Sequence, residues 1–421
     1  MTNASPTRAG HLRGLSRLAA EATLGVTELV EAVHRTISAG PAPLGASSSA
    51  ETTSGIAGFV YGSVRGATRL VGSGVDAALA RLAPLLGELP PSPRREALVA
   101  VLNGVLGDHL ESTGNPLAIP MRLRRNGKDL ESGPIPWAAI PPDGPREVVL
   151  MLHGLCMNDT GWRRDGHDHG EALERDLGLA AVHVVYNSGR HVSTNGRELA
   201  TLLEARFGEG VVPREGLTIV AHSMGGLVAR SALHHATRAA YRWPRLLRAI
   251  VFLGTPHHGA PLERLGNLFQ AALGASPWSL PFGRLGKIRS AGITDLRHGD
   301  LLVEDREGVD RFARQADLRH PVPLPEGVAC FAVAGTKSKG AAVGDRLSGD
   351  GLVPVASALG RHRDPERTLA FPPERTLVAF GTNHLGLLGS REVYERVRGW
   401  VEHGRRATAA SGAASSRRFA P

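Results

Sequence analysis

Hydrophobic and polar residues alternate along this chain in two patterns that predict different kinds of structure. In residues 10–39 an apolar stripe recurs at helical spacing and predicts one long helix. A second helical pattern covers residues 56–86, and Ser92-Pro93 is typical of the start of a third helix that runs to about Leu110. Residues 40–55 are rich in Pro, Ser, Gly, Ala and Thr, which favours a linker. The stripe of the first helix consists of Leu12, Leu15, Leu18, Ala22, Val26, Leu29, Val33 and Ile37.

Residues 1–112 are therefore predicted to be a helical segment without evident chemistry. Its second helix contains Gly58, Gly62 and Gly66, and because glycine is costly inside a helix, we expect another surface to pack closely there. That surface is either the rest of the chain or a second copy. The alternative is attachment to a lipid surface or granule, which the balanced charges of the segment make the weaker interpretation.

From residue 117 onward the apolar runs shorten and predict strands. Asn126-Gly127 is a hairpin turn signal, so we expect an antiparallel pair first. Later runs alternate with helical patterns, which predicts a mostly parallel sheet with helices on both faces, over residues 113–404. Residues 405–421 read as a basic disordered tail. The expected strands lie near residues 119–123, 146–152, 180–186, 217–220, 248–253, 327–334 and 376–380.

One strand is followed by the pattern of a serine nucleophile. In Ala221-His222-Ser223-Met224-Gly225 the serine stands between a β-branched run and a helix, with small residues two positions before and after. Small residues are needed because the serine backbone in such a turn is strained. The usual first residue is Gly, so Ala221 is a variant. A serine that only caps the helix is the alternative.

A serine hydroxyl needs a base, which in turn needs an orienting group. Asp350 lies between two glycines after the strand near residues 327–334, and His384 follows the last strand. Asp345 is the rival acid. The chain order Ser, Asp, His is that of an α/β-hydrolase triad, with Ser223 as nucleophile, Asp350 as acid and His384 as base. The oxyanion formed by attack needs backbone N–H donors, for which Leu155 and Met224 are the candidates and Cys156 the fallback.

These motifs together resemble the α/β-hydrolase superfamily, and within it the lipases and the GPI inositol-deacylase-like esterases. The resemblance covers residues 146–403 and implies ester hydrolysis by the triad, without a cofactor. Acyl transfer or polyester depolymerisation by the same triad is the alternative, and a lipid-surface or granule-associated protein working through residues 1–112 is another. The motifs are His153-Gly154-Leu155, Ala221–Gly226, Leu253–Gly259, Asp350–Pro354 and Asn383-His384.

Further side chains are candidates for the substrate site. Residues 261–303 carry Phe269, Trp278 and Phe282 and are either a surface insertion or a lid over an acyl chain. Arg190 follows a strand and either binds a substrate anion or pairs with a nearby acid. His167-Asp168-His169 suggests a metal site, but a polar helix start is the stronger interpretation, so we predict no metal.

Composition limits the remaining function classes. The net charge is +9 with no aromatic-interleaved basic stripe, so nucleic acid is not expected as a partner. Two cysteines far apart, no signal peptide and no long apolar run favour a cytoplasmic protein without a transmembrane helix, with peripheral membrane contact as an option. The expected substrate is a small-molecule or lipid ester, and the sequence does not fix the oligomeric state.

Overall fold

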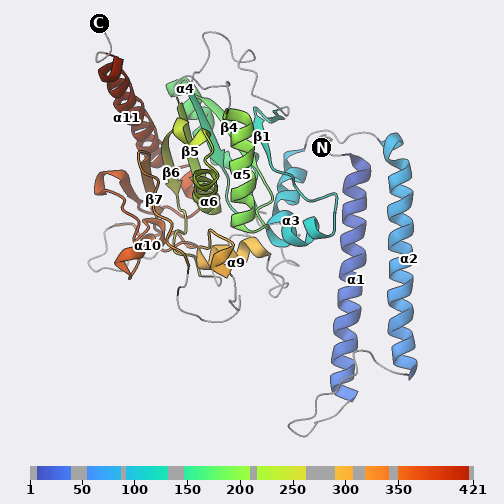
Figure 1. Ribbon diagram of the computed structural model, residues 1–421. Helices are drawn as coiled ribbons and strands as arrows, with labels where there is room; N and C mark the ends of the chain where they lie inside the picture. The colour runs from blue at the N-terminus through green and yellow to red at the C-terminus, as the bar shows by residue number, and fades with distance from the viewer. Residues whose placement is uncertain are drawn as a thin grey trace. The chain divides into compact units, whose positions relative to one another are not determined.

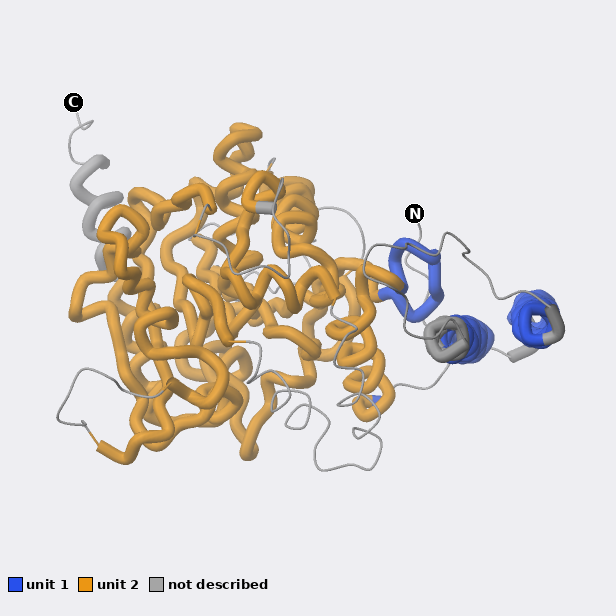
Figure 2. Tube along the Cα trace, turned by 90° about the horizontal axis from the view of Figure 1, so that it is seen from below, with its two compact units in different colours: residues 1–92, 110–118 blue, residues 93–109, 119–421 orange. Residues whose placement is uncertain are grey.

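The computed structural model describes most of the chain and divides it into two compact units. Unit 1 comprises residues 1–92 and 110–118, and unit 2 comprises residues 93–109 and 119–421 (Figure 2). Each unit is treated separately below. The described residues are 7–38, 55–86, 92–130, 147–208, 216–261, 290–306, 317, 319–340 and 349–416.

Unit 1 is built around a hairpin of two long helices, α1 (Arg8–Ser38) and α2 (Gly55–Leu86) (Figure 1). They run antiparallel, since Arg13 near the start of α1 contacts Asp76 near the end of α2. Both helices agree with the prediction from periodicity. Gly14 of α1 also lies close to Leu117, in the short segment of unit 1 that follows α3 (Pro93–Ser112).

Within the described residues, the apolar stripe of α1 and the glycines of α2 do not form the packing contacts that the sequence suggests. Leu12, Leu15 and Val26 are 48%, 49% and 61% exposed. A Cβ added at Gly62 or Gly66 would meet nothing within 4 Å among the described residues. Nothing in the described part of the chain packs against Gly62 or Gly66, and packing against a second copy stays a prediction.

Unit 2 contains an eight-stranded sheet that is parallel except at one edge (Figure 1). Strands β1 and β2 form an antiparallel hairpin, and its turn places Asn126 and Gly127 at φ 51° and 72°, the backbone that an Asn-Gly turn favours. β1 also pairs antiparallel with β4, and all other pairs are parallel. Every residue of β3 and β5 is buried, so the core lies around these central strands. In sheet order the strands are β2 (Lys128–Asp129), β1 (Arg122–Arg125), β4 (Ala180–Val185), β3 (Glu147–Leu152), β5 (Gly216–His222), β6 (Leu247–Leu253), β7 (Ala329–Gly335) and β8 (Thr376–Ala379).

Helices cover the sheet as the alternating pattern predicts. α5 and α6 pack against each other, and α11 contacts α4 and the strands β6, β7 and β8. The sequence predicts a disordered tail from residue 405, whereas α11 continues as a helix to Ser416. No helix among the described residues is long and apolar enough to cross a membrane. The helices of unit 2 are α4 (His169–Leu177), α5 (Val192–Phe207), α6 (Met224–Arg238), α9 (Ala291–His298), α10 (Val355–Ala358) and α11 (Arg391–Ser416).

Most of α3 lies in unit 2, although the sequence groups residues 1–112 together. Its glycines explain the difference. A Cβ on Gly104 would lie 2.2 Å from Cys156 Sγ, and one on Gly107 would lie 1.8 Å from Asn187 Oδ1. These distances are too short for any side chain, so α3 touches the two loops after β3 and β4 directly. The helix is therefore part of the frame that holds those loops.

Candidate active site

Ser223 has the strained backbone expected of a nucleophile elbow. Its φ is 55° and its ψ is −123°, a conformation that is uncommon for any residue other than glycine. The Ser223 N–H donates to Leu253 O at 2.8 Å, which continues the sheet ladder and fixes the turn between β5 and α6. A Cβ on Gly225 would lie 2.5 Å from Leu152 O, so only glycine fits two positions after the serine.

Asp350 and His384 come together at the same edge of the sheet. Nδ1 of His384 donates to Asp350 Oδ2 at 2.6 Å, and both side chains are almost fully buried. Asp350 Oδ1 accepts the N–H groups of Leu352 and Val353 at 2.9 and 2.8 Å. The His384 N–H donates to Asp350 O at 3.1 Å. Three hydrogen bonds hold the carboxylate in place, and it fixes the histidine in one tautomer and leaves Nε2 with a lone pair.

Nε2 of His384 is buried and has no hydrogen-bond partner within the described part of the chain. A buried polar atom without a partner is rare and costs free energy, and such atoms accumulate at functional sites. Asp345, the rival acid, lies outside the described residues.

His222 supports His384, a role that was not predicted from the sequence. Its ring centroid lies 4.7 Å from that of His384, and its Nε2–H donates to His384 O at 3.2 Å. A Cβ on Gly154 would lie 3.0 Å from both His222 Nδ1 and Ser223 Cβ. The side chains of His222 and Ser223 are therefore tightly packed around Gly154. Burial holds the pKa of His222 well below its usual value. Its position in the sequence could have indicated this supporting role, because His222 directly precedes Ser223.

The loop after β3 is fixed by buried polar contacts. Tyr186 stacks on His153 with 4.2 Å between ring centroids and donates from its hydroxyl to His153 O at 2.7 Å. His153 Nε2 accepts the Tyr186 N–H at 3.3 Å, so its proton lies on Nδ1, which donates to Gly154 O. Burial lowers the pKa of His153 to about 4 and keeps the ring neutral.

The two predicted oxyanion donors lie on this loop and on α6. The Cys156 N–H, the fallback donor, donates to Ser188 Oγ at 3.0 Å and is therefore occupied. Met224 is the first residue of α6, where backbone N–H groups have no intrahelical acceptor. Leu155 is buried and lies one residue after Gly154, where an added Cβ would lie 3.0 Å from Ser223 Cβ. The roles of Leu155 and Met224 remain predictions.

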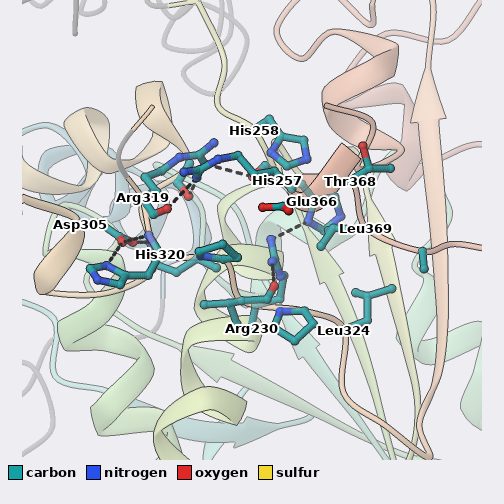
Figure 3. Close-up of a pocket in the computed structure, with 17 residues that line it drawn as sticks. Arg230, His257, His258, Asp305, Arg319, His320, Leu324, Glu366, Thr368 and Leu369 are labelled. Carbon is teal, nitrogen blue, oxygen red and sulfur yellow. Dashed lines mark hydrogen bonds and ion pairs between the residues drawn. The ribbon is translucent and has the colours of Figure 1, made fainter. Parts of the chain in front are cut away.

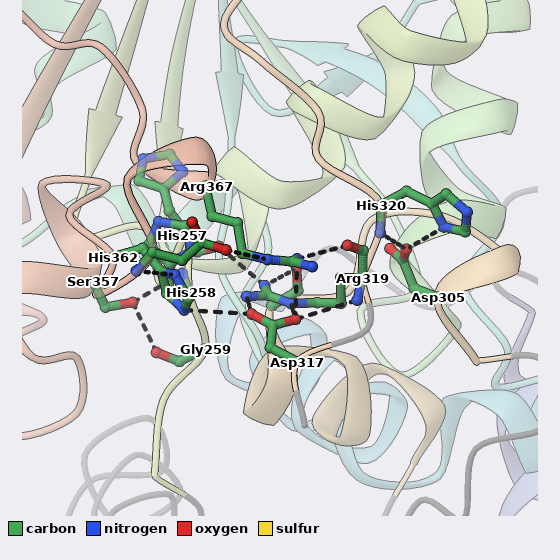
Figure 4. Close-up of polar contacts among 12 residues, drawn as sticks. His257, His258, Gly259, Asp305, Asp317, Arg319, His320, Ser357, His362 and Arg367 are labelled. Atoms are coloured by element: carbon green, nitrogen blue, oxygen red, sulfur yellow. Dashed lines mark hydrogen bonds and ion pairs between the residues drawn. The ribbon is translucent and has the colours of Figure 1, made fainter. Parts of the chain in front are cut away.

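A polar cluster holds the loop after β6. Asp317 accepts from Arg319 at 2.6 Å, and Arg319 donates to His257 O and Gly299 O at 3.3 and 3.0 Å (Figure 4). Ser357 Oγ accepts the His258 N–H at 3.1 Å and donates to Gly259 O at 2.8 Å. The same loop begins with residue 254, where a Cβ would lie 3.2 Å from the His384 ring. The cluster thus stabilises a loop that borders the predicted base.

A cavity of about 350 Å³ lies next to this loop (Figure 3). Arg230 of α6 reaches into it, donates to His257 Nδ1 at 3.3 Å and also donates to Val322 O. Burial lowers the pKa of Arg230 to about 10, so the guanidinium stays charged at neutral pH. His257, whose pKa burial holds well below its usual value, is neutral and can accept this bond.

The remaining predicted residues have mixed outcomes. Arg190 forms an ion pair with Glu198, the local pairing that the sequence left open.

His167 Nε2 and His169 Nδ1 lie 2.8 Å apart, and Asp168 caps α4 by accepting the Glu171 N–H. Among the described residues no group of His, Cys, Asp or Glu side chains could hold a metal ion. Phe269, Trp278 and most of the expected lid lie outside the described residues.

Comparison with known proteins agrees with this architecture. Residues 145–320 match the family model described as PGAP1-like alpha/beta domain. Together with the mostly parallel sheet, this match confirms the resemblance and the α/β-hydrolase fold expected from the sequence. No curated protein matches the sequence.

Several solved structures are similar to part of the chain. A mature lipase of Bacillus licheniformis has 20% identity and a TM-score of 0.37, over 59% of this chain and 88% of the lipase. An esterase of Pyrobaculum calidifontis has 14% identity and a TM-score of 0.39, over 75% of this chain and 91% of the esterase. The type II thioesterase YbtT of the yersiniabactin pathway has 16% identity and a TM-score of 0.37, over 62% and 95%.

Proposed function

We propose that this protein hydrolyses carboxylic esters through an acyl-enzyme on Ser223. The observation that carries the proposal is the strained Ser223 turn at the sheet edge where Asp350 orients His384 at 2.6 Å. A serine held at positive φ costs about 1–3 kcal/mol of free energy. A serine that only caps a helix does not need this conformation. A nucleophile that must project from a strand–helix turn does require it.

In the first half of the proposed reaction, Ser223 Oγ attacks the ester carbonyl carbon while His384 Nε2 takes the hydroxyl proton. The tetrahedral oxyanion accepts hydrogen bonds from the N–H groups of Leu155 and Met224. When it collapses, the bond to the leaving oxygen breaks, and His384 returns the proton to that oxygen as the alcohol departs.

In the second half, water attacks the acyl-enzyme and His384 removes a proton from it. The bond to Ser223 Oγ breaks, the serine regains its proton from His384, and the carboxylic acid leaves. Asp350 stabilises the imidazolium in both halves without becoming protonated itself. Two hydrogen bonds from backbone N–H groups and the burial of its side chain support this role of Asp350.

The cysteines support the proposed cytoplasmic location, which is a reducing compartment. Cys156 and Cys330 are both free and buried. Burial raises the pKa of Cys330 to about 12 and that of Cys156 further, so both stay as unreactive thiols.

Active-site labelling tests the function. The full chain should react with a fluorophosphonate probe and turn over p-nitrophenyl butyrate, and Ser223→Ala should lose both. A matched control is Ser231→Ala on α6, whose hydroxyl is buried against Leu301 O and lies away from the triad. Labelling of Ser223→Ala at the rate of the unmodified chain would overturn the assignment.

A further inference from the structure

The hairpin of unit 1 places several of its charged residues between its two helices. Asp76 of α2 accepts hydrogen bonds from Arg13 and Arg17 of α1 at 2.9 to 3.1 Å. These bonds hold the pKa of Asp76 well below its usual range. Farther along, Arg65 of α2 forms an ion pair with Glu31 of α1, whose side chain is only 5% exposed. The contact between the two helices therefore includes ion pairs beside a close approach of Gly72 to Ala20.

The outside of the hairpin is apolar. Of the thirteen large apolar side chains exposed among the described residues, eleven lie on α1 and α2. The most exposed are Phe59 at 76%, Leu70 at 74%, Val71 at 64% and Val26 at 61%. A hairpin in water has the opposite distribution, with apolar residues between the helices and charges outside. The arrangement fits a hairpin whose surroundings are apolar.

The shape of this outer surface argues against a single partner helix. Consecutive residues point about 100° apart around a helix. The neighbours Phe59 and Val60, and likewise Leu70 and Val71, are all exposed. The apolar arc of α2 is thus much wider than the narrow seam that a second helix covers in a coiled coil. A lipid surface can cover such an arc.

The charges on α2 favour an anionic surface. Its charged residues are Arg65, Arg69, Asp76 and Arg81, and the two that carry the ion pairs face α1. Arg69 and Arg81 are exposed. Nothing acidic on the outer side of this helix opposes an anionic headgroup, and each nearby arginine adds about 1 kcal/mol to binding.

We propose that the outer surface of the α1–α2 hairpin, with Phe59, Leu70 and Val71 as its main apolar contacts and Arg69 and Arg81 as its cations, binds an anionic lipid surface. The helices lie on the surface and do not span it, in line with the finding that no described helix could cross a membrane. The ion pairs between α1 and α2 keep the charges away from the acyl chains while the hairpin is bound.

Vesicle flotation of the full chain tests this proposal. The chain should bind vesicles of phosphatidylcholine with phosphatidylglycerol, and more weakly those of phosphatidylcholine alone. Phe59→Gln/Leu70→Gln/Val71→Gln should lower partitioning into both by at least about tenfold, because three apolar contacts are lost. Arg69→Gln/Arg81→Gln should lower binding only to the anionic vesicles, by about tenfold or more. Leu98→Gln, at an exposed apolar residue of α3 in unit 2, is the matched control and should bind as the unmodified chain does.

Three results would overturn the proposal. They are no binding by the unmodified chain, equal binding by the triple variant, and a dimer that the triple variant converts to a monomer in the absence of any vesicle binding. The last result would assign the surface to a second copy. Hydrolysis of a dissolved short ester, measured on the same samples, reports on the triad separately, so failure of one proposal is distinguishable from failure of the other.

Discussion

The two units of this protein distribute polar and apolar side chains in opposite ways. In unit 2 the apolar residues are buried around β3 and β5, and the buried polar groups meet where the parallel strands end. In unit 1 ion pairs lie between α1 and α2, while many large apolar side chains face outward. Unit 2 is thus stabilised by its own core, whereas the hairpin leaves its apolar area for something outside it.

This difference shows why an apolar stripe alone does not tell which side of a helix is buried. The stripe of α1 has the spacing of a packing face, yet ion pairs occupy the contact with α2. Single substitutions and a change of pH can break or sharpen one side of this comparison.

The largest effect is expected from Asp350→Asn. Loss of the carboxylate removes the group that holds His384 with its lone pair on Nε2, and kcat should fall by about 10⁴-fold. Steady-state turnover of p-nitrophenyl butyrate measures this loss. Asp345→Asn is the control and should leave turnover within a few fold, and a reversal of the two results would transfer the acid role to Asp345.

Acid should destabilise unit 2 and spare the hairpin. Burial lowers the pKa of His153 and of His169 to about 4, so the unfolded chain binds more protons than the folded chain between pH 6.5 and 4. The free energy of unfolding should therefore decrease as the pH falls, by about 2 kcal/mol per histidine at pH 5. Asp76 stays ionised over this range, which preserves the ion pairs of the hairpin.

Urea unfolding at pH 7 and pH 5 measures the effect. His169→Gln, which keeps a donor toward Leu387 O, should show a smaller pH dependence than the unmodified chain. If the free energy of unfolding changed equally with pH in the two proteins, this would contradict a neutral, buried His169 in the folded chain.

Alanine in place of glycine should have opposite effects in the two units. In α3, Gly107→Ala should destabilise the protein by about 1–3 kcal/mol, since the new Cβ would collide with Asn187. In α2, Gly62→Ala meets open space and should stabilise the hairpin by about 0.5–1 kcal/mol. Chemical denaturation followed by circular dichroism compares them, and destabilisation by Gly62→Ala would reveal a packed surface there.

A similarly small effect is expected from Asp76→Asn. The arginines that it pairs with are 28% and 30% exposed, so solvent screens the interaction and the loss should be about 1 kcal/mol. The helical signal of the hairpin during thermal unfolding reports this change. Glu28→Gln on the exposed side of α1 is the control. An equal shift in its unfolding temperature would mean that the ion pairs of Asp76 do not stabilise the hairpin.

Much of the fold follows from local sequence signals. Strand runs bounded by turns predict β3 to β8 within a few residues, and Asn126-Gly127 predicts the edge hairpin because few other residues accept positive φ. The order of Ser223, Asp350 and His384 points to one architecture, and the pairing of the last two follows from it. Each of these signals lies within a short stretch of chain.

What the sequence missed depends on contacts between distant segments. The support of His384 by His222 joins the end of β5 to the loop after β8, and the packing of α3 against Asn187 depends on three-dimensional approach. The orientation of the hairpin depends on which arginine meets which carboxylate, and a count of charges cannot reveal that. Arg190 differs, because its pairing with the nearby Glu198 is one of the two alternatives that the sequence left open.

The close approach of α3 to the loops after β3 and β4 has a consequence for truncation. A chain that began after residue 112 would lack the glycines that touch Cys156 and Asn187, and the loop carrying Leu155 would lose its neighbour. A chain that began at Ser92 would lack α1 and α2 yet retain that contact. Lost activity after the longer deletion would therefore report on an unsupported loop and would say nothing of the hairpin.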